Sequence, residues 1–188
     1  MRNKENSEIF LFTCLCPEKA HQNSREWTLC AAQAYFEKQG ILMPALRYAD
    51  SGKPYFDRSE HFLSVTHSDR FFAAAFAPFP IGIDAESESE ARARIAARYF
   101  TEREKQMPFS LVWTAKEAVS KISGKGLGIV SKIHVESEKS ARMGEERFFL
   151  SSRTVDTFRL TLAWQEEQTE RASCRKNGSR KTIRDLSV

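Results

Sequence analysis

The chain has 188 residues, of which 41% are hydrophobic and 29% charged, and its 29 Lys and Arg against 25 Asp and Glu give a formal net charge of +4. This composition is that of an ordinary folded protein, long enough for one domain or two small ones. The 8 Gly and 6 Pro exclude collagen and low-complexity classes, and the longest near-apolar run, residues 71–83, is shorter than the roughly 20 residues of a membrane-spanning helix. We therefore expect a cytoplasmic protein with no membrane partner.

The first half of the sequence predicts a strand, a helix and a pair of strands. The apolar residues 9–16 are expected to form a strand rather than a secretion signal, because acidic residues precede them and no small-x-small cleavage site follows. Ser24 is the expected N-cap of a helix over residues 24–38, which Gly40 ends. A loop over residues 51–54 and paired strands over residues 62–66 and 71–77 follow.

The second half predicts a similar alternation of strands and helices. A strand over residues 81–86 is followed by a helix over residues 90–100. Thr101 and Glu104 then have the spacing of a capping box. The remaining expected elements are a helix that Pro108 opens and Gly124 ends, and strands over residues 129–135, 147–150 and 157–164.

These elements predict an α+β fold in two comparable halves, residues 1–80 and 81–164, followed by a tail over residues 165–188. The tail contains few large apolar residues, so we expect it to be mobile. Its six basic and four acidic residues leave the folded body nearly balanced in charge. We therefore expect no nucleic-acid partner.

Two carboxylates, Asp84 and Glu86, lie two residues apart on the strand over residues 81–86, so both point to one face. A hard divalent ion satisfies two such neighbouring carboxylates, and Mg²⁺ typically takes one or two of them together with substrate phosphates. The alternative is a strand end that runs into an acidic surface stretch.

A second group of candidate residues lies on the helix after Pro108, where Trp113, Glu117 and Lys121 share one face at i, i+4 and i+8. Glu117 is a candidate third metal carboxylate, and Lys121 a candidate phosphate-binding ammonium. The alternative is an exposed Glu–Lys pair that stabilises the helix by about 0.3–0.5 kcal/mol.

Two further short segments carry groups that suit a phosphate. The sequence Thr66-His67-Ser68 places a ring nitrogen between two hydroxyls, and Lys53 lies on a loop that Pro54 stiffens. A structural histidine and a simple turn are the alternatives.

Taken together, the motifs resemble the 4′-phosphopantetheinyl transferase superfamily, in its Sfp-like branch. The resemblance covers about residues 50 to 135. It is carried, in chain order, by G-K-P (52–54), T-H-S (66–68), I-G-I-D-A-E (81–86), R-Y-F-T-E-R-E (98–104) and W-T-A-K-E-A-V-S-K-I-S-G-K-G-L (113–127).

The resemblance implies a fold of two similar α+β halves that form a pseudo-dimer in one chain. It also implies a holo-[acyl-carrier-protein] synthase type of activity. The enzyme would move the 4′-phosphopantetheine arm of coenzyme A onto a serine of an apo acyl or peptidyl carrier protein, releasing adenosine 3′,5′-bisphosphate. The implied metal is Mg²⁺, and we expect a monomer.

The same resemblance assigns roles to individual residues. Asp84, Glu86 and Glu117 correspond to the magnesium ligands, and Lys121 to the lysine on the diphosphate. Either Glu117 or a metal-bound water would take the proton of the serine hydroxyl. The implied coenzyme A contacts are His67 and Thr66 to the 3′-phosphate, and Lys53 with Pro54 beside the nucleotide.

The sequence departs from the family pattern at several positions. Asp69 stands where the family often has glycine, Thr66 replaces a serine, and Trp27 stands where a helix arginine is common. A second hypothesis is therefore a catalytically weak homologue that binds coenzyme A or a carrier protein as an accessory subunit. A third hypothesis, an unrelated metal-dependent nuclease, is disfavoured by the balanced charge of the body.

Overall fold

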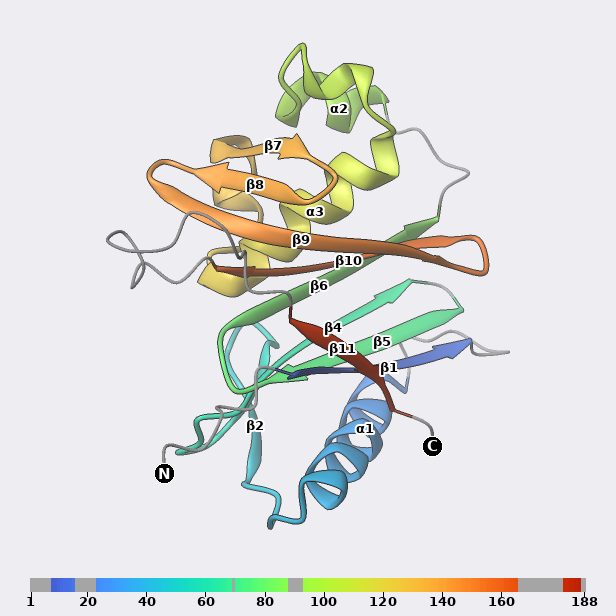
Figure 1. Ribbon diagram of the computed structural model, residues 1–188, viewed down its shortest axis with the longest axis vertical. Helices are drawn as coiled ribbons and strands as arrows, with labels where there is room; N and C mark the ends of the chain where they lie inside the picture. The colour runs from blue at the N-terminus through green and yellow to red at the C-terminus, as the bar shows by residue number, and fades with distance from the viewer. Residues whose placement is uncertain (1–7, 16–22, 69, 88–92, 166–180, 187–188) are drawn as a thin grey trace.

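The computed structural model describes residues 8–15, 23–68, 70–87, 93–165 and 181–186, which form a mixed α+β fold (Figure 1). Its elements are, in chain order, β1 (Glu8–Leu15), α1 (Ser24–Gln39), β2 (Leu46–Tyr48), β3 (Pro54–Phe56), β4 (Phe62–Ser68), β5 (Phe71–Ala77), β6 (Ile81–Ser87), α2 (Ala93–Tyr99), the 3-10 helix η1 (Glu104–Gln106), α3 (Phe109–Ser123), the 3-10 helix η2 (Gly126–Lys132), β7 (Ile133–Ser137), β8 (Ser140–Met143), β9 (Glu146–Val155), β10 (Phe158–Gln165) and β11 (Thr182–Asp185).

Within the described residues, the strands form two larger sheets and one small hairpin. The first sheet has four strands in the order β11-β1-β5-β4, and the second has five in the order β6-β10-β9-β8-β7. β2 and β3 pair separately, in the antiparallel sense. Because β4 ends the first sheet and β6 ends the second, each of them has one edge without a neighbouring strand in its own sheet.

The two sheets pack face to face, and one helix covers the outer face of each (Figure 1). Side chains alternate along β5, so that Phe71 and Ala73 point between the sheets while Phe72 and Ala74 point toward α1. This explains why a strand of seven apolar residues is buried on both faces. α3 packs on the other side of the second sheet, against residues such as Phe148 on β9.

Both long helices end as the sequence predicts. Gly40 and Gly124 adopt left-handed backbone angles, with φ of 69° and 70°, directly after α1 and α3. The predicted capping box is confirmed: the Thr101 amide donates to Glu104 Oε2 at 2.7 Å, and the Glu104 amide donates to Thr101 Oγ1 at 3.2 Å. The predicted cap of α1 is wrong by one residue, because Asn23 precedes the helix and Ser24 is its first residue.

The C-terminal segment differs from the prediction of a mobile tail. Residues 166–180 lie outside the described residues, but Thr182–Asp185 form β11, which pairs in parallel with β1 at the edge of the first sheet. Leu186 is buried in the core beneath α1, and its amide donates to Leu11 O at 2.8 Å. Arg153 of the second sheet forms a two-pronged ion pair with Asp185, at 2.7 and 3.2 Å. β11 thus connects the two sheets.

Three other predicted elements differ in extent. The predicted strand over residues 147–150 is observed as the longer β9, Glu146–Val155. The predicted strand over residues 129–135 is wrong in its first part, because Gly126–Lys132 form η2 and the strand begins only at Ile133. Ile129 and Val130 are buried against α3, so these apolar residues are part of the core although they belong to a 3-10 helix and not to a strand. The predicted helix over residues 90–100 is observed as α2 from Ala93, and residues 88–92 lie outside the described residues.

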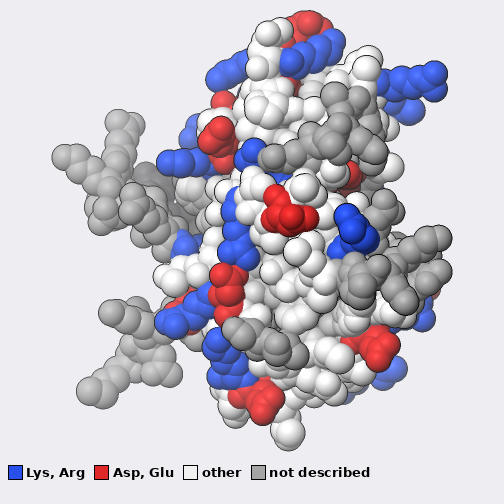
Figure 2. Space-filling view, turned by 90° about the vertical axis from the view of Figure 1, so that its right-hand side faces the viewer, with Lys and Arg blue, Asp and Glu red and all other residues white. Residues whose placement is uncertain are grey.

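The described surface carries charges of both signs. On the face drawn in Figure 2, Lys and Arg side chains are interspersed with Asp and Glu around a broad uncharged area. Leu42, Leu127 and Leu15 are the most exposed of the large apolar side chains in the described ranges. No helix among the described residues is both long and apolar enough to cross a membrane.

Candidate active site

The candidate site forms where β6 passes closely beneath α3. Gly82 makes this approach possible, because a Cβ at that position would lie 1.8 Å from the carbonyl oxygen of Ala118 on the helix. Asp84 is two residues further along the strand, so it points to the same side as Gly82, toward α3. The helix presents Glu117 and Lys121 one turn apart on this side.

The free edges of the two sheets meet at this position. On β6, the amide of Ile83 donates to Ser64 Oγ on β4 at 3.1 Å. Two residues further along β4, the Thr66 hydroxyl donates to Asp84 Oδ1 at 3.0 Å. Side chains of one edge strand therefore satisfy polar groups of the other, and the site lies in the seam between the two sheets.

Asp84 is the most buried of the predicted carboxylates, with 6% of the residue exposed. Its Oδ1 accepts hydrogen bonds from Thr66 and, at 2.9 Å, from the ammonium of Lys121. Its Oδ2 is buried and has no hydrogen-bond partner among the described residues. A buried carboxylate oxygen without a partner is costly, so this atom is suited to accept a cation.

Lys121 brings its ammonium to the same seam. Besides Asp84, its Nζ donates to the carbonyl oxygens of Ile83 at 2.8 Å and Val65 at 3.3 Å. Its own carbonyl oxygen accepts a hydrogen bond from Lys53 Nζ at 2.6 Å. Burial, and secondarily the charge of Lys121, lowers the pKa of Lys53. The predicted loop lysine and the predicted helix lysine are thus close together.

Glu117 is half-buried one turn before Lys121. Burial and then the negative charge of Asp84 raise its pKa to about 7; Lys121 opposes this shift and Glu86 adds to it. Glu117 therefore lies within electrostatic reach of both other predicted carboxylates. The alternative of an exposed Glu117–Lys121 pair is wrong, because the ion pair of Lys121 is with Asp84.

The residues of the seam fit a hard divalent cation by chemistry. Their donors are carboxylate oxygens, one of which is buried without a partner, and Mg²⁺ prefers such oxygen ligands. As they stand, no three His, Cys, Asp or Glu side chains in the described part of the chain are grouped closely enough to hold a metal ion. The metal-ligand roles of Asp84, Glu86 and Glu117 therefore stay predictions.

The predicted phosphate cluster at Thr66-His67-Ser68 does not form a single group. Neighbouring residues of a strand point to opposite faces, so Thr66 points to Asp84 while His67 pairs with Phe72 on the side of α1. His67 is exposed there. Pro54 is buried at the start of β3, directly after Lys53.

A buried ion pair that the sequence did not single out as functional supports α3 from behind. Lys116 Nζ lies 3.0 Å from Glu104 Oε1, and both side chains are almost fully buried. Burial raises the pKa of Glu104, but hydrogen bonds from the Thr101 and Val135 amides and from Lys116 outweigh it, so this pKa lies below its usual range. The available signal was the lysine at position 116, which lies about 100° around the helix from Glu117 and close to its apolar packing residues.

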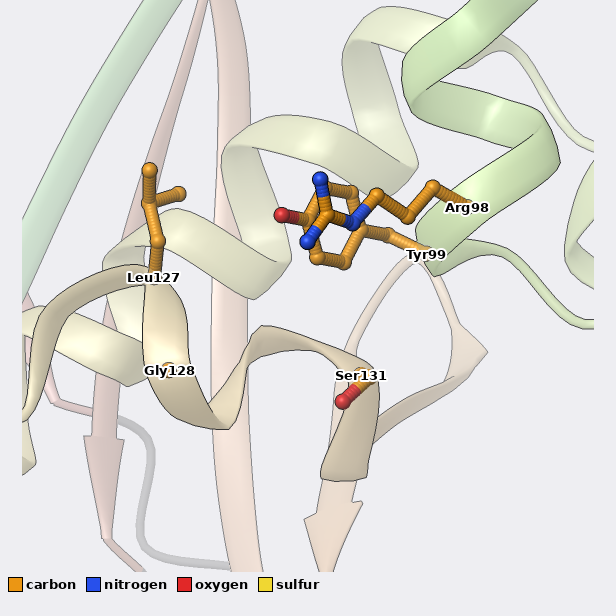
Figure 3. A pocket seen from close by; sticks show the side chains of 5 residues that line it. All are labelled: Arg98, Tyr99, Leu127, Gly128 and Ser131. Carbon is orange, nitrogen blue, oxygen red and sulfur yellow. The ribbon is translucent and has the colours of Figure 1, made fainter.

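A pocket of about 420 Å³ lies between the end of α2 and η2 (Figure 3). It is lined by Arg98, Tyr99, Leu127, Gly128 and Ser131. The guanidinium of Arg98 lies over the Tyr99 ring, 5.3 Å from its centroid. The Tyr99 ring also contacts Trp113 of α3, with 5.7 Å between the ring centroids.

Comparisons with known proteins find similarity to one superfamily of transferases. Residues 80–163 match the family model described as 4′-phosphopantetheinyl transferase superfamily. The chain is 35% identical over 94 residues to 4′-phosphopantetheinyl transferase gsp of Aneurinibacillus migulanus, covering 44% of this chain and 39% of that protein. It is 29% identical over 114 residues to 4′-phosphopantetheinyl transferase Sfp of Bacillus subtilis strain 168, covering 54% and 50%.

A third relative, a 4′-phosphopantetheinyl transferase of Bacillus subtilis, is 34% identical over 113 residues, covering 53% of this chain and 49% of that protein. The chain thus spans half or less of the length of these curated relatives. The predicted resemblance is confirmed for the segment over residues 80–163, which carries Asp84, Glu117 and Lys121 and matches the model of the 4′-phosphopantetheinyl transferase superfamily.

Proposed function

We propose that this chain transfers the 4′-phosphopantetheine arm of coenzyme A to a serine of an apo acyl or peptidyl carrier protein, with Mg²⁺ as cofactor. The serine oxygen forms a bond to the phosphorus of the arm while the diphosphate P–O bond breaks and adenosine 3′,5′-bisphosphate leaves. The observation that carries the proposal is the buried, unpartnered Oδ2 of Asp84 beside Lys121, within the segment that matches the family.

Phosphoryl transfer requires alignment and charge neutralisation more than covalent help from the protein. Asp84, Glu86 and Glu117 would hold Mg²⁺ through their carboxylate oxygens, and the bound ion would neutralise charge on the diphosphate. The ammonium of Lys121 donates to the same diphosphate. Thr66 orients Asp84 through the hydroxyl hydrogen bond that it already makes.

Glu117 is the proposed general base, directly or through a water, for the proton of the serine hydroxyl. Its pKa of about 7 suits this task, because a base is most effective when its pKa lies near the working pH. Glu117 lies one turn before Lys121 on α3, which supports its proposed role beside the proposed diphosphate-binding cation.

For coenzyme A we propose contacts from four residues of the first half. Lys53 and Pro54 would lie beside the nucleotide, and Thr66 and His67 beside the 3′-phosphate. The contact of Lys53 with the end of α3 supports its place near the proposed coenzyme A site, and the exposure of His67 makes its ring accessible to a ligand. His67 and Thr66 would have to reach coenzyme A from opposite faces of β4.

We also infer that the protein is a cytoplasmic monomer of the holo-[acyl-carrier-protein] synthase type, and that residues 1–80 and 81–164 form two similar halves of a pseudo-dimer. The helix on the outer face of each sheet supports the two-half arrangement. The first sheet, however, also contains β11, which comes from the end of the chain and not from residues 1–80.

The test is incubation of the protein with coenzyme A, Mg²⁺ and a panel of apo carrier proteins, read by intact mass. We expect at least one carrier to gain the mass of the arm, and expect Asp84→Ala to reduce the rate by orders of magnitude. Glu102→Gln, at an exposed acidic residue, is the matched control and should leave the rate unchanged. Binding of coenzyme A or a carrier without any transfer would instead support the accessory role.

A further inference from the structure

We propose that the Lys121 ammonium is the counter-cation of Asp84 in the ligand-free site and must leave Asp84 before a metal ion can bind there. The site would then bind the metal ion together with the diphosphate and not alone. This inference rests on the proposed function. It concerns how the two cations, the lysine ammonium and the metal, share one buried carboxylate.

The ammonium of Lys121 is fully satisfied where it is. It has three N–H donors, and three oxygens accept from it: Asp84 Oδ1 at 2.9 Å, Ile83 O at 2.8 Å and Val65 O at 3.3 Å. Two of these acceptors are on β6 and one is on β4, so the ammonium bridges the seam between the sheets. The ammonium is therefore held in one position by three hydrogen bonds.

This ammonium compensates a carboxylate that cannot be solvated by water. The Asp84 side chain is 9% exposed, so its charge would be costly without a partner. A divalent ion that approaches the free Oδ2 must enter beside the positive charge already on Oδ1. The two cations repel each other, and the ion alone offers the lysine no other acceptor.

A diphosphate changes this balance, because its oxygens can accept the three donors of Lys121. The side chain is 27% exposed, so its ammonium can turn outward to such a ligand. The main chain of Lys121 stays fixed meanwhile, since its carbonyl oxygen accepts from Lys53. Asp84 is then free for the metal, and binding of the diphosphate and of the metal strengthen each other.

The test measures Mn²⁺ affinity of the ligand-free protein by electron paramagnetic resonance, without any turnover. We expect weak binding in the wild type, and in Lys121→Met an affinity at least about tenfold higher, because the competing cation is gone. Lys121→Arg keeps the charge and should keep the weak binding. Lys132→Met, which removes an exposed lysine, is the charge-matched control and should change the affinity less than about twofold.

Thermal unfolding gives a second readout that also reports on folding. Lys121→Met should be less stable than the wild type without metal, and Mn²⁺ should raise its melting temperature more than that of the wild type. If Lys121→Met does not fold, Lys121→Gln replaces it in both measurements. Gln keeps an amide group that can donate hydrogen bonds but carries no charge.

The outcomes separate this inference from the proposed function. If Asp84→Asn abolishes Mn²⁺ binding but neither neutral variant of Lys121 binds Mn²⁺ more tightly than the wild type, the counter-cation role is refuted and the metal site stands. If no variant binds Mn²⁺ even with coenzyme A present, the metal site itself is refuted, and the proposed function with it.

Discussion

The close approach of β6 to α3 predicts that Gly82→Ala is a severe change. The added Cβ would lie 1.8 Å from Ala118 O and 2.8 Å from Ala118 C, both of them backbone atoms of the helix. No side chain can rotate away to make room, so strand and helix must separate by about 1.6 Å to restore an ordinary contact. Such a shift would also pull Asp84 away from Lys121 and Thr66.

We expect Gly82→Ala to lower the free energy of unfolding by about 3 kcal/mol, from overpacking together with weakened hydrogen bonds in the seam. The assay is equilibrium unfolding in urea followed by circular dichroism. Gly128→Ala is the control, because nothing lies within 4 Å of the place that its added methyl group would take, and it should stay within about 0.5 kcal/mol of the wild type. A Gly82→Ala protein within about 1 kcal/mol of the wild type would refute the close packing.

Three further predictions concern the ion pair, the candidate base and the last strand. Lys116→Met leaves the buried Glu104 without its cation and should cost about 3–5 kcal/mol in urea unfolding; a cost below about 1 kcal/mol would contradict the pair. The pKa of Glu117 is about 7 in the folded protein, against an ordinary value of 4.5, so the folded state binds this proton more tightly than the unfolded state. The free energy of unfolding of the ligand-free protein should therefore fall by up to about 3 kcal/mol as the pH rises from 4.5 to 7. Glu117→Gln should remove this slope, and an unchanged slope would show that another group causes it. Deletion of residues 182–188 removes the buried Leu186 and should cost about 2–4 kcal/mol, whereas unaltered stability would show that β11 contributes nothing.

The sequence predicted those features that depend on interactions between residues close together in the chain. Glycines at the ends of α1 and α3, and the reciprocal bonds of Thr101 and Glu104, need only a few neighbouring residues. Strands such as β5 follow from their apolar runs. β11 was missed because its four residues stand in a basic, weakly apolar stretch, and only pairing with β1, more than 160 residues earlier, makes them a strand.

The sequence predicted which residues of β6 and α3 belong to the candidate site. It did not predict which of these side chains contact one another. Spacing placed Asp84 and Glu86 on one face of a strand, and Glu117 and Lys121 on one face of a helix. It could not show that Lys121 turns to Asp84, because this depends on how closely Gly82 lets strand and helix approach. Strict alternation along β4 would have separated Thr66 from His67.

The central claim is that Asp84, Glu86 and Glu117 converge on one metal ion beside a diphosphate that Lys121 binds. Anomalous diffraction from crystals grown with Mn²⁺ and coenzyme A tests it most directly. We predict a single strong anomalous peak within coordination distance of the three carboxylates, with the Lys121 ammonium moved from Asp84 to the diphosphate. A peak elsewhere, or coenzyme A bound while Lys121 remains on Asp84, would contradict the account.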